Sequence, residues 1–283
     1  MAGISANLRR KRKLKNQNQN NTKNRIMKQY DLIILAGGKG TVTLPGQGTR
    51  ARTLAELRGR RLLGYILDGV KGSSRIDTVT LVAHSVNREA FRQALPGEVQ
   101  LCICDGSMAE CACEAIRSVQ KRRGGAETIR VVTVCDDVPF LTGKALDDFI
   151  ARAEVLDADG VYAVVRKEAC VRDYPSLKRT FFHLREGDFT GGNVSMVSST
   201  LFPDCIEKMK QVFALRKNPL KLAGWLGVPF ILKMLLRRLS LKDVETKVSA
   251  LFGYKGRAVI TDYACIGTDL DRAEEWPEAE KYL

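Results

Sequence analysis

The sequence contains only two histidines, His84 and His183, among 283 residues. Nucleophilic catalysis by a Ser–His–Asp arrangement needs a histidine as its base. His84 ends an apolar stretch, and a lone histidine in such a place is more often a packed or surface residue than a base. Aromatic residues are also scarce, at 7%, beside 45% hydrophobic residues. This composition is typical of a soluble globular protein and argues against histidine-based catalysis.

The sequence also lacks an apolar run long enough to cross a membrane. Its most apolar stretch, LAGWLGVPFIL at 222–232, has eleven residues, is interrupted by Pro229 and is followed by the charged KMLLRRL. A membrane-spanning helix needs about 20 apolar residues. Two interpretations stay open for this stretch: a basic amphipathic helix in weak peripheral contact with a membrane surface, and a helical lid packed on a sheet, which is the simpler one.

Carboxylates are missing from residues 7–29, which carry many Lys and Arg residues and an Asn/Gln run. Such a segment cannot bury a core, so we expect a disordered basic tail over 1–29, ahead of one domain over 30–283. Because no apolar stretch follows the basic start, we expect no secretory signal. The formal net charge of +14 is compatible with nucleic-acid or membrane contact, but we expect no specific nucleic-acid partner. The oligomeric state stays open.

The eight cysteines form no disulfide framework, which favours a reduced, cytoplasmic protein. Cys102, Cys104, Cys111 and Cys113 make two C-x-C pairs, but zinc folds usually space their cysteines as C-x2-C. We therefore expect buried thiols here rather than a zinc site.

What the sequence does contain is an alternation of apolar strands and helical patterns. Continuous runs such as DLIILA, DTVTLVAH, QLCIC and IRVVTVC are typical of parallel strands buried on both faces. Helix-patterned stretches follow each of them. We therefore predict an α/β fold, a three-layer α/β/α sandwich around a Rossmann-like, mostly parallel sheet. The second half adds further strands, some antiparallel, and a helical insertion over 203–252.

The stretch YDLIILAGGKGTVTLPGQGTRART, residues 30–53, runs from a strand into a glycine-rich basic loop. Glycines expose backbone N–H groups that can hold phosphates, and ligands of such sheets sit beyond the carboxyl ends of strands. GGKGT lacks the Lys-Ser/Thr ending of a P-loop, and Thr43 stands where a dinucleotide fingerprint needs its third Gly. A strand-to-helix turn without a ligand is the alternative.

Acidic residues follow two other predicted strands. Asp136 and Asp137 directly follow VVTVC and precede a Pro turn, while Asp269 and Asp271 follow RAVITDY. A carboxylate facing the ligand crevice favours a cation, and Mg²⁺ typically bridges one or two carboxylates and substrate phosphates. Solvated turn acids and a helix cap are the simpler alternatives for the two positions.

Three motifs together resemble a known family. LAGG at 35–38, Asp-x-Pro at 137–139 and D-x-D at 269–271 look like the nucleotidyltransferases of the molybdenum-cofactor guanylyltransferase-like (MobA-like) class. The resemblance reaches from Tyr30 to the C-terminus. FTGGN at 189–193 and RKNPLKLAGWLG at 216–227 are similar to one uncharacterised bacterial branch of that class.

The resemblance implies a fold of the nucleotide-diphospho-sugar transferase type. It also implies Mg²⁺-dependent transfer of a nucleoside monophosphate from an NTP to a phosphorylated sugar, cofactor or alcohol, with release of pyrophosphate. Asp137 and Asp271 would bind the metal, and Arg52 stands where the family has a Lys that offsets charge at the α-phosphorus. The residues implied for nucleotide binding are Leu35, Ala36, Gly37, Gly38, Lys39, Gly40 and Arg50. Those implied on the acceptor side are Gly191, Gly192 and Asn193.

Two other functions stay open at this point. The change from Lys to Arg at position 52 is compatible with a nucleotide-binding regulator that has lost the chemistry. The basic tail is compatible with a nucleic-acid or membrane-surface binding protein. Relatives often carry Asn where Cys111 stands near the base, so the sequence selects neither a base nor an acceptor.

Overall fold

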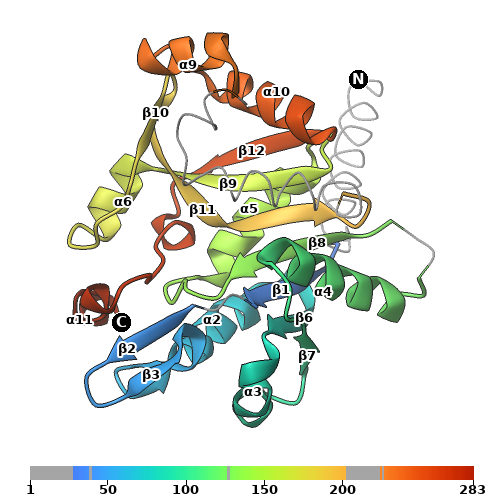
Figure 1. Ribbon diagram of the computed structural model, residues 1–283, viewed down its shortest axis with the longest axis vertical. Coiled ribbons are helices and arrows are strands. Elements are labelled where there is room, and N and C mark those ends of the chain that lie inside the picture. The colour runs from blue at the N-terminus through green and yellow to red at the C-terminus, as the bar shows by residue number, and fades with distance from the viewer. Residues whose placement is uncertain (1–27, 38–39, 126–127, 202–223, 225) are drawn as a thin grey trace, which may run out of the picture.

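The computed structural model describes residues 28–37, 40–125, 128–201, 224 and 226–283. A mixed sheet runs in the order β12-β9-β11-β8-β1-β6-β7, with β10 paired to β11 (Figure 1). The pairs β1–β6, β1–β8, β6–β7 and β9–β12 are parallel, and β11 runs antiparallel to β8, β9 and β10. The strands are β1 (Tyr30–Ala36), β6 (Ile76–Ala83), β7 (Val99–Ile103), β8 (Arg130–Cys135), β9 (Gly160–Arg166), β10 (Phe182–Leu184), β11 (Gly187–Ser198) and β12 (Gly256–Thr261).

Helices cover both faces of this sheet, which confirms the predicted three-layer α/β/α sandwich. One face packs on α2 and α5 through a large buried cluster, and the other packs on α4 and on α9 and α10 through two smaller clusters. Figure 1 shows α9 and α10 over the β12 end of the sheet. The helices are α2 (Leu62–Lys71), α3 (Arg88–Ala94), α4 (Met108–Arg122), α5 (Gly143–Glu154), α6 (Lys167–Asp173), α9 (Val228–Leu235), α10 (Leu241–Phe252) and α11 (Trp276–Ala279).

Capping fixes where two of the helices on the second face begin. Ser107 and Glu110 form a capping box at the start of α4, and Ser240 and Asp243 form another at the start of α10. Each box satisfies backbone N–H groups that have no partner within the helix. Gly253, in the left-handed conformation, ends α10. These local signals therefore set the position of both helices against the sheet.

Two short hairpins between β1 and α2 were not predicted from the sequence: β2–β3 (Thr41–Leu44 and Gly48–Ala51) and β4–β5 (Glu56–Leu57 and Arg60–Arg61). Gly46 and Gly48 belong to the first hairpin, with φ of +73° and +67°. Glycine reaches such angles at little cost, so these two glycines serve the turn. The glycine-rich loop that directly follows β1 therefore ends at Gly40, before β2, and is shorter than the sequence suggests.

Several predictions fall on residues outside the described part of the chain. They are the basic tail, apart from the exposed Lys28 and Gln29, and residues 203–223 and 225 of the helical insertion. The rest of the insertion contains α9 and α10. Across the described ranges, no helix combines the length and apolarity that crossing a membrane requires.

Candidate active site

Two of the predicted segments leave adjacent strands at the same edge of the sheet. β1 ends at Ala36 before the glycine loop, and β8 ends at Cys135 before Asp136 and Asp137. The register pairs Leu35 with Cys135, so the two segments start side by side. Because ligands of open α/β sheets bind beyond the carboxyl ends of the strands, these segments lie where a nucleotide is expected.

The D-x-D segment reaches the same edge from the far end of the chain. After β12 the chain passes through a 3-10 turn, Ala264–Ile266, and the backbone N–H of Leu270 then donates to the Asp137 carbonyl at 2.9 Å. Leu270 is fully buried, so it anchors the segment between its two acids. The backbone bond thus fixes Asp269 and Asp271 beside Asp137.

Asp137, Asp269 and Asp271 form an acidic cluster in which one oxygen of each lies within 4.8 Å of the others. Asp137 is buried, Asp269 is half-buried and Asp271 is exposed. The structure therefore brings together the two acids that were predicted to bind a metal. It also adds Asp269, for which no role was predicted. The signal for it was in the sequence, since residues i and i+2 flanking a buried residue tend to point the same way.

One oxygen of the cluster has no partner. Asp137 Oδ1 is buried and accepts no hydrogen bond from any described residue. Burial raises the pKa of Asp137 to about 7, and the charge of Asp136 raises it too, although Arg52 lowers it. A buried carboxylate oxygen without a donor is costly unless a cation or a proton satisfies it. Since Mg²⁺ prefers carboxylate ligands, the acidic cluster fits a divalent ion.

Arg52 lies among these acids. Its Nη2 is 2.7 Å from Asp137 and 3.3 Å from Asp136, and its Nη1 is 2.5 Å from Asp271. Burial by itself would lower the pKa of Arg52, but the charges of the three carboxylates outweigh burial and raise it. A permanently charged guanidinium thus joins the two acid-bearing segments.

The position of Arg52 also connects the acids to the glycine loop. Its backbone N–H donates to the Gly40 carbonyl at 3.2 Å. A Cβ atom on Gly40 would stand 3.7 Å from Arg52 Nη2. The next residue, Thr53, donates its hydroxyl to Asp136. Arg52 therefore lies between the end of the loop and the acidic cluster, and its role at the α-phosphorus stays a prediction.

Arg179 is a further charged residue of this site that sequence reasoning missed. Its Nη1 donates to Asp269 Oδ1 at 2.7 Å, a second nitrogen donates to the Asp269 carbonyl, and its side chain is 7% exposed. Charge-assisted bonds of this kind hold a carboxylate in place. Nothing in the sequence around position 179 marks it as the partner of an acid 90 residues away.

Of the residues predicted to bind the nucleotide, Leu35 is half-buried, Ala36 is buried and Gly40 is exposed beside Arg52. Gly38 and Lys39 lie outside the described residues. Arg50 lies in the β2–β3 hairpin, where its Nε donates to the Gln47 carbonyl at 3.0 Å. The hairpin, rather than the acidic cluster, therefore holds the Arg50 side chain.

Gly37 allows the loop to pass close to α4. A Cβ at this position would stand 2.9 Å from Cys111 Sγ, closer than side-chain atoms pack. The Cys111 thiol is buried and donates to the carbonyls of Cys104 and Gly106, at 3.3 and 3.5 Å. Burial raises the pKa of Cys111 to about 12. Cys111 is therefore a neutral thiol that holds the segment before α4, as expected of a buried cysteine.

The predicted acceptor-side residues lie in β11 and point in different directions. A Cβ on Gly192 would stand 2.8 Å from Ala163 and 3.0 Å from Ile266, so Gly192 serves close packing. Asn193 donates to the Ile266 carbonyl at 3.3 Å and so supports the turn that precedes the D-x-D segment. At Gly191 a Cβ would stand 3.0 Å from the Tyr162 hydroxyl oxygen.

The two histidines take part in acid pairs elsewhere. His84 Nδ1 is 3.1 Å from Asp105, and His183 Nδ1 is 2.7 Å from Asp188. Asp188 lies in β11 beside β10, and Asp105 follows β7. Neither pair includes a member of the acidic cluster.

The matches to known proteins differ in how much of the chain they cover. The chain matches the family described as the MobA-like NTP transferase domain over residues 32–247. A structure titled as a hypothetical transferase from Thermus thermophilus is 32% identical, with a TM-score of 0.72, over 88% of this chain and 99% of that one. The bifunctional protein GlmU of Thermobifida fusca is 31% identical over 137 residues, which are 44% of this chain and 25% of GlmU.

A more distant structure shares the fold. The 4-diphosphocytidyl-2C-methyl-D-erythritol synthase of Anaerococcus prevotii is 13% identical, with a TM-score of 0.52, over 90% of this chain and 96% of that one. The chain spans about a quarter of the GlmU protein that it matches. The family match, by contrast, covers most of the described chain and includes the glycine loop and Asp137. The chain belongs to the MobA-like NTP transferase family, as its sequence motifs and its sheet indicate.

Proposed function

We propose that the protein transfers a nucleoside monophosphate from an NTP to a phosphorylated small molecule and releases pyrophosphate, in a reaction that depends on Mg²⁺. The observation that carries this proposal is the acidic cluster, which joins the Asp137 and D-x-D segments beside the glycine loop and contains an unpartnered buried oxygen. Family membership supports the nucleotidyl transfer. The unpaired thiols among the described cysteines support a reducing, cytoplasmic setting.

Asp137 and Asp271, with Asp269 beside them, would hold the ion. When bound, Mg²⁺ supplies positive charge against the triphosphate oxygens. The backbone amides of the loop from Leu35 to Gly40 would bind the β- and γ-phosphates. Arg52 reaches the acids from the end of that loop. Its guanidinium would therefore offset the charge that develops near the α-phosphorus.

The chemical step requires little covalent work from the protein. An oxygen of the acceptor phosphate forms a bond to the α-phosphorus, the bond from that phosphorus to the bridging oxygen breaks, and pyrophosphate leaves in line. The residues of the site contribute by positioning the two substrates and by neutralising charge. Asp269 is itself held by Arg179.

The test is pyrophosphate release from each of the four NTPs with Mg²⁺ and a panel of phosphorylated acceptors. Release that requires both an acceptor and Mg²⁺, and that Asp137→Asn abolishes, supports the proposal. Asp157→Asn is the matched control, because this exposed acid pairs with Lys255. Tight NTP binding without release by any acceptor would instead favour the regulatory function.

A further inference from the structure

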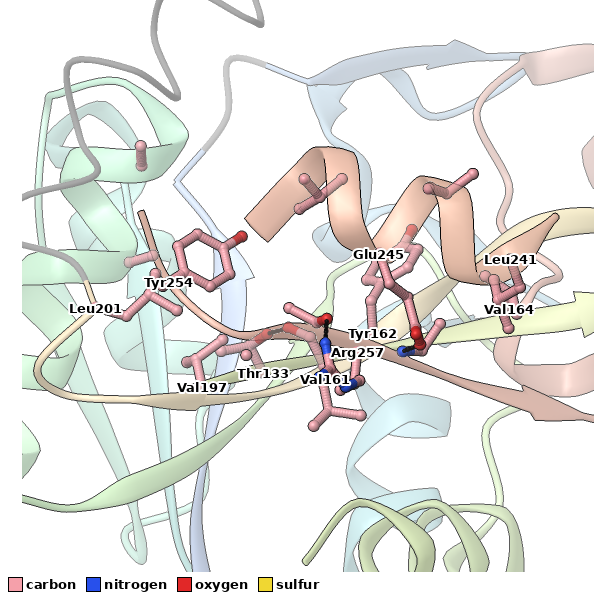
Figure 2. A pocket seen from close by; sticks show the side chains of 18 of the residues that line it. Thr133, Val161, Tyr162, Val164, Val197, Leu201, Leu241, Glu245, Tyr254 and Arg257 are labelled. Carbon is pink, nitrogen blue, oxygen red and sulfur yellow. Dashed lines mark hydrogen bonds between the residues drawn. The ribbon is translucent and has the colours of Figure 1, made fainter. Parts of the chain in front are cut away.

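A large cavity lies on the sheet face that α10 covers. Its volume is about 410 Å³, and it lies between the side chains of α10 and those of β9, β11 and β12 (Figure 2). This volume is within the range of small-molecule sites and far above the 150 Å³ of a cavity that accepts benzene. Apolar residues of its lining include Val164, Leu184, Val197, Leu241, Val244 and Val248.

Several polar groups of the cavity are already engaged with other protein groups. On its floor, Thr133 and Ser195 bond to each other at 2.5 Å. Glu245 points from α10 toward the strands (Figure 2), where it accepts from the backbone N–H of Ala258 at 2.8 Å. Arg257 donates to the Gly256 carbonyl. A ligand rich in hydroxyls would lose its hydration here for few new hydrogen bonds, which is unfavourable.

The cavity borders the proposed active site. Leu35 and Thr133, near the carboxyl ends of β1 and β8, are part of its lining, and so is Tyr162 of β9. Burial raises the pKa of Tyr162, and the neighbouring charges of Asp269 and Asp137 add to this effect. Leu35 and Thr133 thus bring the cavity to the carboxyl edge of the sheet, where Asp136 and Asp137 follow β8.

Because this apolar cavity reaches the carboxyl edge of the sheet, we infer that the acceptor is a phosphate monoester with a hydrocarbon body, such as an alkyl or isoprenyl phosphate. The hydrocarbon lies in the cavity under α10, and the phosphate lies at the carboxyl edge beside Asp137. An oxygen of this phosphate then attacks the α-phosphorus of the NTP, pyrophosphate departs, and the product is a nucleoside diphosphate ester of the alcohol. The inference rests on the proposed function and selects one acceptor class among those that it allows.

The experiment compares monoalkyl phosphates of increasing chain length with glucose 1-phosphate and glycerol 3-phosphate as acceptors. Burial of each methylene contributes a factor of about three to four, so kcat/KM is expected to rise by that factor per carbon until the cavity is full. The longest phosphate is offered both dissolved and in phosphatidylcholine vesicles. Turnover in either form supports the inference and identifies the source of the acceptor.

Val244→Phe places a larger side chain in the cavity from α10. We expect this variant to shorten the preferred chain, so that kcat/KM falls more for long acceptors than for the shortest one. Val171→Phe is the matched control, because Val171 lies on α6 and is 54% exposed. A merely structural role of Val244 would instead change the turnover of all acceptors equally.

The outcomes separate the inference from the function on which it rests. Turnover of a sugar phosphate with no gain from longer alkyl chains overturns the inference and leaves the function in place. If no acceptor is turned over, the function fails, and calorimetric binding of dodecyl phosphate decides the inference. If Val244→Phe weakens this binding and Val171→Phe does not, the cavity is still assigned to a hydrocarbon. If dodecyl phosphate does not bind, the inference is overturned.

Discussion

The two faces of the sheet are filled to different degrees. The face toward α2 and α5 is packed with fully buried side chains, such as Phe149, Leu146 and Ile150 of α5. Among the described residues, the face toward α10 leaves a cavity of about 410 Å³, and its lining includes Leu35 and Thr133 near the carboxyl ends of β1 and β8. We propose that the filled face supplies stability and that the face with the cavity binds the acceptor.

Asp137 tests the functional side of this comparison most strongly. Asp137→Ala removes the buried carboxylate of the acidic cluster, and we expect kcat to fall by about 10²–10³-fold or more. Pyrophosphate release with saturating Mg²⁺ measures the effect. Asp136→Ala, which removes the neighbouring acid on the same turn, should cost less. Near-normal release by the Asp137 variant would refute its assignment as a metal ligand.

A pair of truncations tests the stability side. Phe149→Ala on the filled face should lower the free energy of unfolding by about 3–5 kcal/mol. Val244→Ala on the face with the cavity should lower it by less than about 1 kcal/mol, because its side chain already borders empty space. Urea denaturation of both variants gives the comparison. Equal losses would show that the two faces contribute alike.

The pH dependence of the metal-free protein sharpens the comparison at Asp137. The pKa of Asp137 is raised to about 7, so the folded state keeps a proton that the unfolded state releases near pH 4. Its contribution to stability is therefore present at low pH and is lost as the pH rises toward 7. In EDTA, Asp137→Asn should stabilise the protein by about 2–4 kcal/mol more at pH 8 than at pH 5.

Asp157→Asn is the control for the pH experiment, because the pairing of Asp157 with Lys255 lowers the pKa of this exposed carboxyl. Asp157→Asn should change the free energy of unfolding little, and by the same amount at both pH values. An Asp137→Asn effect independent of pH would contradict the raised pKa.

A substitution of Arg52, at the same carboxyl edge of the sheet, should have a smaller effect on kcat. Arg52→Lys keeps the charge but cannot reproduce the guanidinium contacts to Asp137 and Asp271, so we expect kcat to stay within about tenfold of the wild type. Steady-state kinetics with saturating NTP measures this. Complete loss would show that the two-pronged contact, rather than the charge alone, is required.

The smallest effect is expected from the tail. Deletion of residues 1–27 should leave both the chain-length preference and turnover unchanged, since no residue of the proposed site lies in this segment. Kinetics of the truncated protein at low and high salt checks this. A loss of activity that depends strongly on salt would instead support phosphate-backbone or membrane-surface binding by the tail.

Much of the filled core could be predicted, since continuous apolar runs identified β1, β6, β7 and β8, and helical periodicity identified α4 and α5. The two hairpins between Thr41 and Arg61 could not be predicted, because their strands are short and mix polar with apolar residues. At the site, Asp137 and Asp271 could be predicted from the resemblance. Arg179 could not, since its pairing with Asp269 depends on how distant segments fold together.

The cavity under α10 was likewise invisible in the sequence. Apolar residues of β9, β11 and α10 have the same pattern whether their side chains meet or leave a space between them. Only the distance of α10 from the sheet decides this, and no single residue specifies that distance. The sequence predicted a helical lid near this position, but not what lies beneath it.

The backbone bond from Leu270 to Asp137 has a consequence for the order in which the protein gains activity during synthesis. Asp137 leaves the ribosome long before the D-x-D segment, which follows the edge strand β12. A nascent chain therefore has Asp137 but lacks Asp269 and Asp271, which the proposed function needs for the metal. On the proposed function, metal-dependent turnover should therefore begin only when the last strand has joined the sheet.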